Sequence, residues 1–536
     1  MNTAAANTYD EIPYSKHAYP QTHPDRLATM ATFFGMAPAP VERCRVLELG
    51  CGAGGNLIPM ALTMPGSTFL GIDLSGRHVA EGHKAVAALG LGNIELRHLS
   101  ILDVDESVGQ FDYLICHGVY SWVPDSVRDK ILDIAARQLA ANGVIYISYN
   151  TYPGWHLHEA LRHMVVYHTR AHAEPRERIR QARSLLDVLA RTVGADGDPH
   201  RTELREALAM LRDQQDYYLF HEYLEEVNQP VYFHQFAERA AASGLQYLGE
   251  AETDPLEAST HTPGAEEALR HVAPELVARH QFLDFLNNTQ FRQSLLCRAE
   301  VALNRRPGLE CLSAVVIASR LQPISPPVDV RSTRVEDFGD ESDSVGTDNP
   351  ILKSALLCLL EAWPRALPFA SLCALARDRL GPSVAGGGVG GGAGGGDGGD
   401  AARDREVLGT DLLRIWRVSK MVELHVFSPP FVLDVSERPV ASPLVRAQAA
   451  AGPLVTNLCH NTIRLDEVSR HVLRRLDGHH DLPALVPVLE NLVAQGVLRV
   501  VPEGEPIPVG ERLRQALLAS VEQNLRALAR CALLMK

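Results

Sequence analysis

The chain has 536 residues, a length that predicts about three or four domains. Its 51 Lys and Arg residues against 65 Asp and Glu residues give a net charge of −14 and an isoelectric point near 5.9. This charge argues against a duplex-DNA partner, because DNA binding requires surface cations that replace the counterions of phosphate. A hydrophobic content of 46% and a charged content of 22% exclude disorder of the whole chain.

The nine cysteines are scattered and none forms a CxxC pair, which argues against a zinc ribbon or a dithiol redox motif. Such a set is typical of a reducing compartment. Residues Met1–Lys16 contain no apolar leader core, and no uninterrupted apolar stretch is long enough to cross a bilayer. We therefore expect a cytoplasmic protein that is not inserted into a membrane.

Short apolar runs alternate with helical patterns over the first 150 residues. The expected strands are Arg45–Leu49, Thr68–Ile72, Ile94–His98, Tyr113–Cys116 and Val144–Ser148. The expected helices are Asn56–Thr63, Gly76–Leu89 and Ser126–Ala141. Strands separated by helices predict right-handed crossovers and a mostly parallel sheet, so this part is expected to be α/β.

The middle of the chain is predicted to be largely helical. Leu161–Tyr223 has helical periodicity, with breaks near Pro175 and at Gly194–Pro199. A further helix is expected over Val231–Ala242 and a strand over Leu245–Leu248.

The C-terminal half combines helices with short β elements. Its expected helices are Ile351–Leu380, interrupted near Pro364 and Pro368, then Asp404–Met421, Leu465–Leu476 and Leu482–Gln495. A strand pair over Val422–Leu433 and a strand over Gly496–Val501 complete an α+β, winged-helix-like pattern. We expect it to recognise protein or to brace the chain internally, because no helix is strongly basic. Gly381–Asp400 is expected to form a flexible loop, since it contains too little apolar surface to fold.

The strongest local pattern is Val46–Asn56, in which an apolar strand and an acid precede a glycine-rich turn that opens a helix. Glycines in such a turn allow a ligand to approach the backbone closely. The turn also satisfies the dinucleotide GxGxxG pattern, and Asp73 ends the next strand where either NAD or S-adenosylmethionine needs a ribose-binding carboxylate. Glu48 favours S-adenosylmethionine, because a carboxylate attracts its cationic amino-acid end and repels a pyrophosphate.

Four segments together resemble the motifs of class I S-adenosylmethionine-dependent methyltransferases: ELGCGAGGN, GIDLS, FDYLICHGVYSWVP and NGVIYISYN, in that order. The resemblance implies a Rossmann-like domain that uses S-adenosyl-L-methionine as its cofactor. The cofactor-binding residues it implies are Glu48, Gly50, Cys51, Gly52 and Asn56 at the methionine end, Asp73 at the ribose, Leu74, Ser100 and Ile101 at the adenine, and Cys116 and His117 beside the methyl group. The third motif usually has an acid in place of Ser100, so adenine recognition is left open, with Asp103 as one alternative.

A narrower resemblance rests on four further segments, Tyr9–Pro24, Tyr149–Trp155, His221–Phe233 and Ser436–Leu444. They are similar to bacterial methyltransferases that carry a methyltransferase regulatory domain, a group that includes rickettsial protein-lysine methyltransferases acting on an outer-membrane surface protein. The implied partner is therefore a protein substrate, such as a surface or outer-membrane protein. The domain division we expect is 1–160 with about 225–255 for the cofactor, 161–224 as a helical insertion, 255–345 as a regulatory middle domain, and 346–536 as the winged-helix-like domain containing loop 381–400.

Methylation of a lysine requires a neutral amine, and an apolar aromatic channel would lower the amine's pKa and attract its cationic form. Aromatic residues follow the predicted strands at the carboxyl edge of the sheet, where ligands of open α/β sheets bind. The catalytic candidates are Tyr14, Tyr19, His117, Tyr149, Tyr152 and Trp155. Tyr120 and Trp122 are candidates for the opposite wall, and each ring has the alternative role of a core or loop anchor.

The proton acceptor is left open among His117, His156, His158 and bulk water. No metal is expected, since the pair His168 and His172 has no third ligand nearby. The Glu222, Glu225 and Glu226 cluster is expected to be a solvated helix face and not a catalytic dyad, with the attraction of cationic, lysine-bearing substrates as a further role.

The leading hypothesis is an S-adenosylmethionine-dependent methyltransferase that modifies lysine side chains of a protein. The alternatives are a small-molecule or RNA methyltransferase, and a regulatory protein that binds the cofactor without catalysis. An NAD-dependent dehydrogenase is the weakest alternative, because Glu48 disfavours a pyrophosphate.

Overall fold

The computed structural model describes residues 12, 17–194, 197–252, 265–339, 343–381, 397–498 and 510–535. Tyr14, nearly all of the glycine-rich tract (382–396) and residues 499–501 of the last predicted strand lie outside the described residues. No helix within the described ranges is long and apolar enough to cross a membrane.

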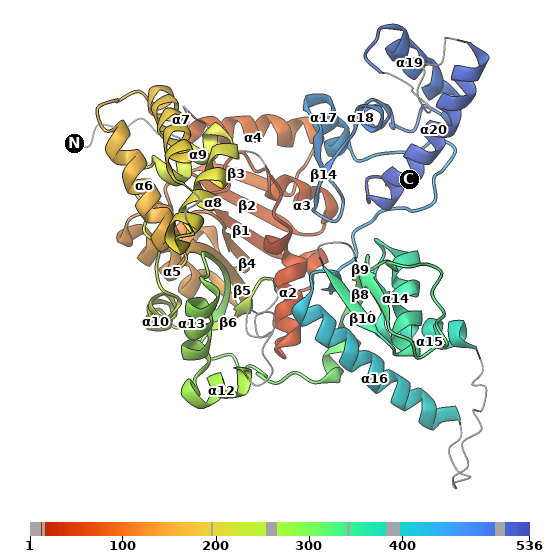
Figure 1. Ribbon diagram of the computed structural model, residues 1–536, viewed down its shortest axis with the longest axis horizontal. Helices are drawn as coiled ribbons and strands as arrows, with labels where there is room; N and C mark the ends of the chain where they lie inside the picture. The colour runs from red at the N-terminus through yellow and green to blue at the C-terminus, as the bar shows by residue number, and fades with distance from the viewer. Residues whose placement is uncertain are drawn as a thin grey trace.

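Among the described residues, a seven-stranded sheet forms the centre of the N-terminal half (Figure 1). Its strands are β1 (Arg45–Leu49), β2 (Thr68–Asp73), β3 (Ile94–His98), β4 (Phe111–Cys116), β5 (Leu139–Asn150), β6 (Leu245–Glu250) and β7 (Phe291–Arg298). Their order is β3-β2-β1-β4-β5-β7-β6, and β7 runs antiparallel to both of its neighbours. The predicted mostly parallel sheet is confirmed, and β1 and β3 have the predicted bounds.

Each face of this sheet is covered by its own helices, because alternate side chains of a strand point to opposite sides. Val46 packs on one face, and Leu47 and Leu49 pack on the other. The first face is covered by α2 (Pro24–Phe33), α3 (Leu57–Thr63) and α4 (Gly76–Leu89), and the second by α5 (Asp125–Gln138) and α10 (Phe233–Ala242). The carboxyl edge of the sheet between these layers is left to loops.

The helix predicted over Ser126–Ala141 ends earlier, at Gln138, and β5 begins at the next residue. Leu139 pairs with Phe111 of β4, and the register then shifts so that Val144 lies opposite Tyr113. Pairing with a buried neighbouring strand therefore overrides the helical periodicity at the end of this segment.

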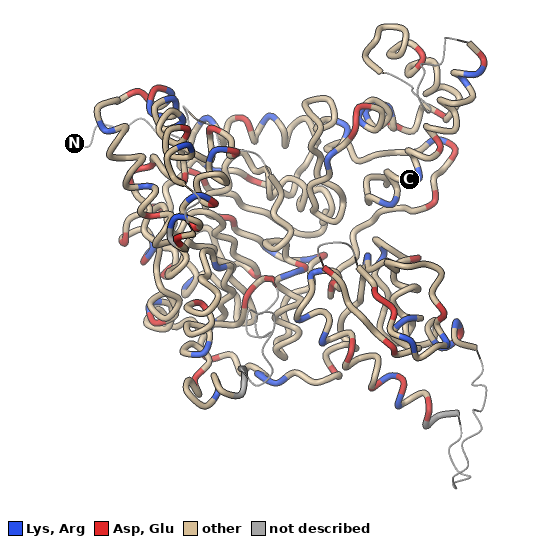
Figure 2. Tube along the Cα trace, in the orientation of Figure 1, with Lys and Arg blue, Asp and Glu red and all other residues tan. Residues whose placement is uncertain are grey.

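A lobe of four helices extends from the end of β5, as the periodicity predicts. Its members are α6 (Trp155–Thr169), α7 (Pro175–Thr192), α8 (Pro199–Asp213) and α9 (Asp216–Tyr223). They share a core that includes Leu161, Leu186 and Phe220. Figure 2 shows acidic and basic residues interspersed along these helices. His172 lies beyond the end of α6, so it does not share a helix with His168.

The segment after β6 returns to the main sheet. Helices α12 (Ala265–Val272) and α13 (Leu276–Asn287) lead into β7, which the sequence analysis did not predict. Residues 255–345 were expected to form a separate middle domain, whereas β7 lies between β5 and β6. The missed strand completes the sheet of the N-terminal half.

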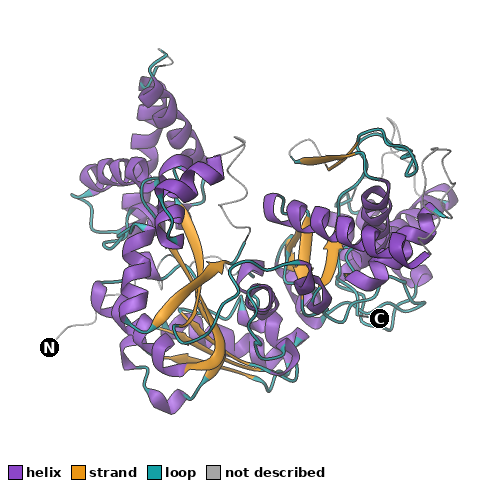
Figure 3. Ribbon diagram, turned by 90° about the horizontal axis from the view of Figure 1, so that it is seen from below, coloured by secondary structure: helices purple, strands orange, loops and turns teal. Residues whose placement is uncertain are grey.

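A second lobe contains smaller sheets and further helices (Figure 3). Its strands are β8 (Val316–Ser319), β9 (Glu336–Gly339), β10 (Ser344–Thr347), β11 (Leu367–Pro368) and β12 (Val422–His425), and its helices are α14 (Pro350–Ala362), α15 (Phe369–Leu380) and α16 (Asp397–Val418). Leu356 and Trp416 of this lobe belong to the same buried cluster as Leu27 of α2. The two lobes therefore share one hydrophobic core.

The strand pair predicted over Val422–Leu433 is wrong in its second half, since only β12 forms. The backbone N–H groups of Val426 and Phe427 donate to the carboxylate of Asp25, at 2.8 Å each, instead of to a strand. Pro429 and Pro430 have no N–H group to donate to a ladder.

The C-terminal region consists of α17 (Pro443–Ala451), β13 (Leu454–Thr456), β14 (Thr462–Arg464), α18 (Glu467–Leu473), α19 (Leu482–Ala494) and α20 (Glu511–Arg530). It has a core of its own, to which α20 contributes Leu513, Leu517 and Val521. Helix α20 was not predicted, and Gly496–Leu498 of the last predicted strand do not form a strand.

Arg292 of β7 is the most deeply buried charged residue of the sheet, with a side chain that is 1% exposed. Its Nη1 donates to Oε1 of Glu250 at 2.7 Å, and its Nε donates to Oδ2 of Asp284 at 2.9 Å. The guanidinium also lies 3.9 Å from the centre of the Phe233 ring. One cation thus compensates two buried carboxylates and joins β6, β7 and α13.

We predict that Arg292→Met destabilises the protein by about 3–5 kcal/mol, because it leaves buried carboxylates uncompensated. Urea denaturation followed by tryptophan fluorescence measures the change. Arg97→Met is the control, since its pair with Glu95 is exposed and is worth about 1 kcal/mol or less. Equal denaturation midpoints for the two variants would contradict the assigned role of Arg292.

Candidate functional site

The turn between β1 and α3 brings its backbone to the carboxyl edge of the sheet. Gly50, Gly52 and Gly54 have positive φ angles of 77°, 55° and 75°, which favour glycine. A Cβ atom on Gly50 would lie 2.5 Å from Cγ2 of Val119, whereas one on Gly52 would meet no atom within 4 Å. The turn therefore needs glycine for its conformation and presents an open backbone at Gly52.

Asp73, the last residue of β2, supports this turn. One carboxylate oxygen accepts a hydrogen bond from the N–H of Gly52 at 2.7 Å, and the other accepts from the N–H of Ser75 at 2.8 Å. Ser75 in turn caps α4 by accepting from the N–H of His78. The carboxylate is thus held beside the glycine turn.

A cavity of about 460 Å³ lies at this edge of the sheet. It is lined by loops that follow β1, β2, β3 and β4 and by the segment that precedes α2. The predicted site residues that line it are Tyr19, Glu48, Gly50, Cys51, Gly52, Asn56, Asp73, Leu74, Ser100, Ile101 and His117. Most of the cofactor-binding candidates are therefore brought together around one cavity.

Glu48 lies at the base of this cavity and is 4% exposed. Its Oε1 accepts a hydrogen bond from Nδ2 of Asn56 at 2.8 Å, whereas its Oε2 is buried without a hydrogen-bond partner. Burial raises the pKa of Glu48 to about 8, against the opposing effect of the Asn56 hydrogen bond. A buried carboxylate oxygen without a donor fits a ligand that brings a cationic amine into the cavity.

Asn56 connects this carboxylate to two other parts of the chain. Its Nδ2 also donates to Oγ1 of Thr22 at 2.9 Å, and its Oδ1 accepts from the backbone N–H of Tyr19 at 3.0 Å. The second bond to Oδ1 comes from Nε2 of His460 at 2.8 Å, across 404 residues of sequence. All four hydrogen bonds that the amide can make are present, so its orientation towards Glu48 is determined.

His460 was missed by the sequence analysis. It lies in the turn between β13 and β14, has a φ angle of 64°, and is 3% exposed. Burial lowers its pKa well below the usual value, so the imidazole is neutral and donates through Nε2. No local pattern could reveal this contact, because it exists only where the C-terminal region meets the glycine turn.

His117 and Tyr19 form one wall of the cavity, with ring centres 4.0 Å apart. Nδ1 of His117 lies 3.0 Å from the Tyr146 hydroxyl and 3.2 Å from Oγ of Ser148. Burial lowers the pKa of His117 to about 4, and burial raises that of Tyr19 to about 12, with Glu48 as a further cause. Both side chains are therefore neutral at physiological pH.

Several candidates lie away from the cavity. Tyr149 is in the sheet core, stacked on Phe236 with ring centres 4.3 Å apart, because its position on β5 faces α10. Cys116 is fully buried in the same core. Tyr152 stacks on His156 and donates to Glu159.

Trp155 does not line the cavity. Trp122 does, and the centres of the two indole rings are 6.5 Å apart. His156 and His158, two of the three histidines considered as proton acceptors, do not line the cavity. They lie against the hydroxyl groups of Tyr232 and Tyr223.

Glu222 corrects the prediction of a solvated helix face. This residue of α9 lines the cavity, together with His221, and burial raises its pKa to about 8. Oε1 of Glu225 lies 2.9 Å from Nδ1 of His221. Glu226 is the exposed member of the three acids. The aromatic composition of α9, DYYLFHEY, is the one sequence signal that its polar residues face a buried surface.

Among the described residues, no group of three His, Cys, Asp or Glu side chains is arranged to hold a metal ion.

Comparison with known proteins agrees with this geometry. Residues 40–220 match a family model described as a methyltransferase domain, and residues 215–298 match a predicted methyltransferase regulatory domain. Residues 437–533 match the C-terminal winged helix domain of PKMT. With the sheet order and the orphaned carboxylate at the glycine turn, these matches define a Rossmann-like, S-adenosylmethionine-dependent methyltransferase with a winged-helix C-terminal domain.

Similarity to individual proteins extends over almost the whole chain. An uncharacterized protein of Rickettsia prowazekii is 35% identical over 95% of this chain and 90% of its own length. The structure of PKMT2 from Rickettsia typhi aligns with a TM-score of 0.86 at 28% identity, covering 98% of this chain and all of that one. Its complex with AdoHcy aligns with a TM-score of 0.85. The chain belongs to this family of methyltransferases with a regulatory domain and a PKMT winged-helix domain, and its cofactor is S-adenosylmethionine.

We predict that Glu48→Gln weakens AdoHcy binding about 10- to 100-fold, because a charged hydrogen bond to the ligand's amine is lost. In the wild-type protein the dissociation constant should fall as the pH rises from 6 to 8. Below its pKa of about 8, Glu48 is protonated and must ionise to bind a cation. Isothermal titration calorimetry over this range measures both effects, with exposed Glu95→Gln as the control. An unchanged affinity in Glu48→Gln would refute the role of this carboxylate.

We predict that His460→Ala also weakens AdoHcy binding, by about 5- to 100-fold, because Asn56 loses a donor that orients its amide. Calorimetry should show no further loss when His460→Ala is added to Asn56→Ala, since the effect passes through that amide. His471→Ala, in the same C-terminal domain but outside the cavity, is the control. If the losses of AdoHcy affinity add up in the double variant, His460 does not act through Asn56.

Proposed function

We propose that this methyltransferase transfers methyl groups to lysine side chains of a protein substrate. The observation that carries the proposal is a further carboxylate of the cavity, that of Glu222, which lines it together with the aromatic side chains of Tyr19 and Trp122. The similarity to PKMT2 of Rickettsia typhi, whose abbreviation stands for protein lysine methyltransferase, supports the same acceptor. A cavity with one carboxylate for the cofactor's amine and another for the acceptor suits a cationic side chain.

The residues present fit the cofactor, because Glu48 offers a buried, unpaired oxygen to its amino group. We assign the methionine end to Glu48 and the backbone of the glycine turn, the ribose to Asp73, and the adenine to Leu74 and Ile101. S-adenosylmethionine supplies a methyl carbon activated by its sulfonium. The chain's own task is to position the acceptor and to remove its proton.

Positioning falls to the neutral aromatic wall. Tyr19 and His117 carry no charge at physiological pH, and Trp122 closes the other side. Such rings attract an ammonium by cation–π contact worth about 0.5–2 kcal/mol and exclude water. A desolvated lysine amine loses its proton more readily than a free one, whose pKa is about 10.4.

Proton removal is assigned to Glu222. Its side chain forms no hydrogen bond or ion pair with the described residues, and its charge is one of the causes that raise the pKa of Tyr19, which lines the same cavity. The ionised carboxylate takes one proton from the acceptor ammonium, which leaves a lone pair on nitrogen for the new N–C bond. The proton then passes from Glu222 to solvent. A pKa of about 8 lies close to the working pH that a general base requires.

Incubation with S-adenosylmethionine labelled in its methyl group tests the acceptor. The substrates are fragments of bacterial surface proteins, total RNA and a metabolite extract, and mass spectrometry locates the label. Methylated lysine in the protein fragments is the expected result. Label found only in RNA or in small molecules would overturn the protein-lysine proposal and leave the methyltransferase class intact.

We predict that Glu222→Gln lowers the rate of lysine methylation about 100-fold, because an amide cannot accept the proton. The wild-type rate should rise as the pH passes through 8, where Glu222 becomes ionised, and the variant should lack this rise. Glu226→Gln is the matched control, since that neighbouring carboxylate is exposed. The affinity for AdoHcy should stay the same in both variants. A wild-type rate profile in Glu222→Gln would show that water takes the proton directly.

A further inference from the structure

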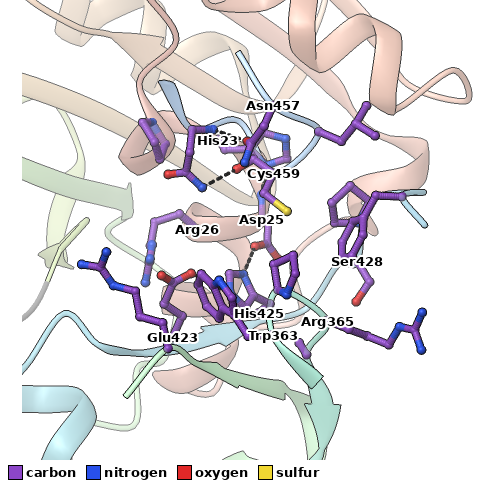
Figure 4. Close-up of a pocket in the computed structure, with 18 of the residues that line it drawn as sticks. His23, Asp25, Arg26, Trp363, Arg365, Glu423, His425, Ser428, Asn457 and Cys459 are labelled. Carbon is purple, nitrogen blue, oxygen red and sulfur yellow. Dashed lines mark hydrogen bonds and ion pairs between the residues drawn. The ribbon is translucent and has the colours of Figure 1, made fainter. Parts of the chain in front are cut away.

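A second and larger cavity lies on the other side of the segment that precedes α2. This cleft has a volume of about 870 Å³, and residues from α2, β12, the end of α14 and the β13–β14 turn line it. Figure 4 shows Asp25 in contact with the ring of His425, and Asn457 and Cys459 from the C-terminal domain near His23 and Asp25. The cleft is thus built where three parts of the chain meet.

The acidic residues of the cleft are all engaged. Oδ2 of Asp25 accepts from Nδ1 of His425 at 2.7 Å, and Oε2 of Glu423 lies 3.2 Å from Nε2 of the same ring. These two carboxylates raise the pKa of His425 to about 9 against the effect of its burial, so the imidazole is charged. Glu252 forms an ion pair with Lys420. Glu423 also lies near Arg26 and Arg320, whose positive charges help to lower its pKa.

Three guanidinium groups of the cleft make no direct ion pair within the described residues. Those of Arg26, Arg320 and Arg365 line it and form no hydrogen bond or ion pair there, although the first two lie near the carboxylate of Glu423. Arg320 and Arg365 are exposed, and Arg26 is half-buried. The cleft therefore presents an excess of guanidinium groups, although the chain as a whole carries a net charge of −14.

Apolar side chains form the remaining wall. Trp363, Trp416, Phe427 and Phe431 lie among the lining residues, and Trp363 and Arg365 are close together in Figure 4. Guanidinium groups bind carboxylates through paired hydrogen bonds, and indole rings pack against aliphatic or aromatic side chains. A polypeptide carries both carboxylates and apolar side chains along one extended segment. A free phosphate or a small acid offers only an anionic group.

The cleft and the cofactor cavity share a wall. Tyr19 lines the cofactor cavity, whereas its chain neighbours Pro20 and Gln21 line the cleft. A polypeptide in the cleft therefore lies next to the cavity that contains Glu48 and Glu222. The cofactor chemistry described above does not use this second cavity.

We propose that the cleft binds a stretch of the protein acceptor that is rich in carboxylates and lies near the lysine to be methylated. This inference rests on the proposed function for the identity of the ligand as a protein acceptor. The chemistry of methyl transfer requires only one amine of the acceptor. Binding of an acidic stretch in the cleft would explain how the enzyme selects a particular protein substrate. Because Arg320 and Arg365 are exposed, their substitution should not disturb folding.

The test compares the wild-type protein with the double variant Arg320→Glu/Arg365→Glu and with Arg512→Glu, an exposed control on α20 outside the cleft lining. The probe is a fluorescent peptide of alternating Glu and Leu residues with one lysine, and anisotropy measures its binding. We expect the double variant to bind this peptide about tenfold more weakly or worse, and the control to bind it normally. Unchanged binding in the double variant would overturn the proposal.

Two further measurements separate this inference from the proposed function. The double variant should bind AdoHcy normally and should methylate a short lysine peptide without acidic residues at the wild-type rate. A raised KM for the acidic peptide alone supports the cleft as its site. If inorganic phosphate at millimolar concentration displaces the peptide completely, the cleft is a small-anion site and the proposal fails. If the peptide binds through the cleft but no lysine is methylated, the proposed function fails and the binding site stands.

Discussion

One buried carboxylate constrains the whole functional site. Glu48 is surrounded by protein on nearly every side, and one of its oxygens has no donor. Burial of such a group costs free energy that a cationic ligand recovers on binding. The glycine turn, the placement of Asp73 and the closure by Tyr19 all surround this one acceptor, and together they favour a ligand with a positive end.

The link from Glu48 to the rest of the molecule passes through Asn56. This amide joins the glycine turn to Tyr19 and Thr22 on one side and to His460 on the other. A second set of hydrogen bonds joins the same N-terminal segment to the second lobe: Asp25 of α2 accepts from His425 of β12 and from the two residues that follow it. The hydrophobic core is also continuous between the two lobes, so the C-terminal half is connected to the cofactor site both by this core and by the contact of His460 with Asn56.

The predicted sheet and the cofactor motifs agree with the structure because their signals are local. A strand such as Arg45–Leu49 and a turn such as Gly50–Gly55 are specified by neighbouring residues, through side-chain alternation and the conformational freedom of glycine. The aromatic candidates were less predictable. Tyr149 and Tyr152 follow the expected strand, but one faces the core and the other packs on His156, since the orientation of a side chain depends on the elements packed against it.

The sequence by itself determined the class of protein, the cofactor, and the residues of the glycine turn with Asp73, because these depend on contacts within the first 150 residues. Only the tertiary structure decided the rest of the site. Glu222 reaches the cavity because the four-helix lobe folds back over the sheet edge, and His460 reaches Asn56 across 404 residues. No local pattern marks His460, and the one local signal at Glu222 is the aromatic composition of α9. Contacts of such long range follow from the packing of whole lobes, which no window of sequence contains.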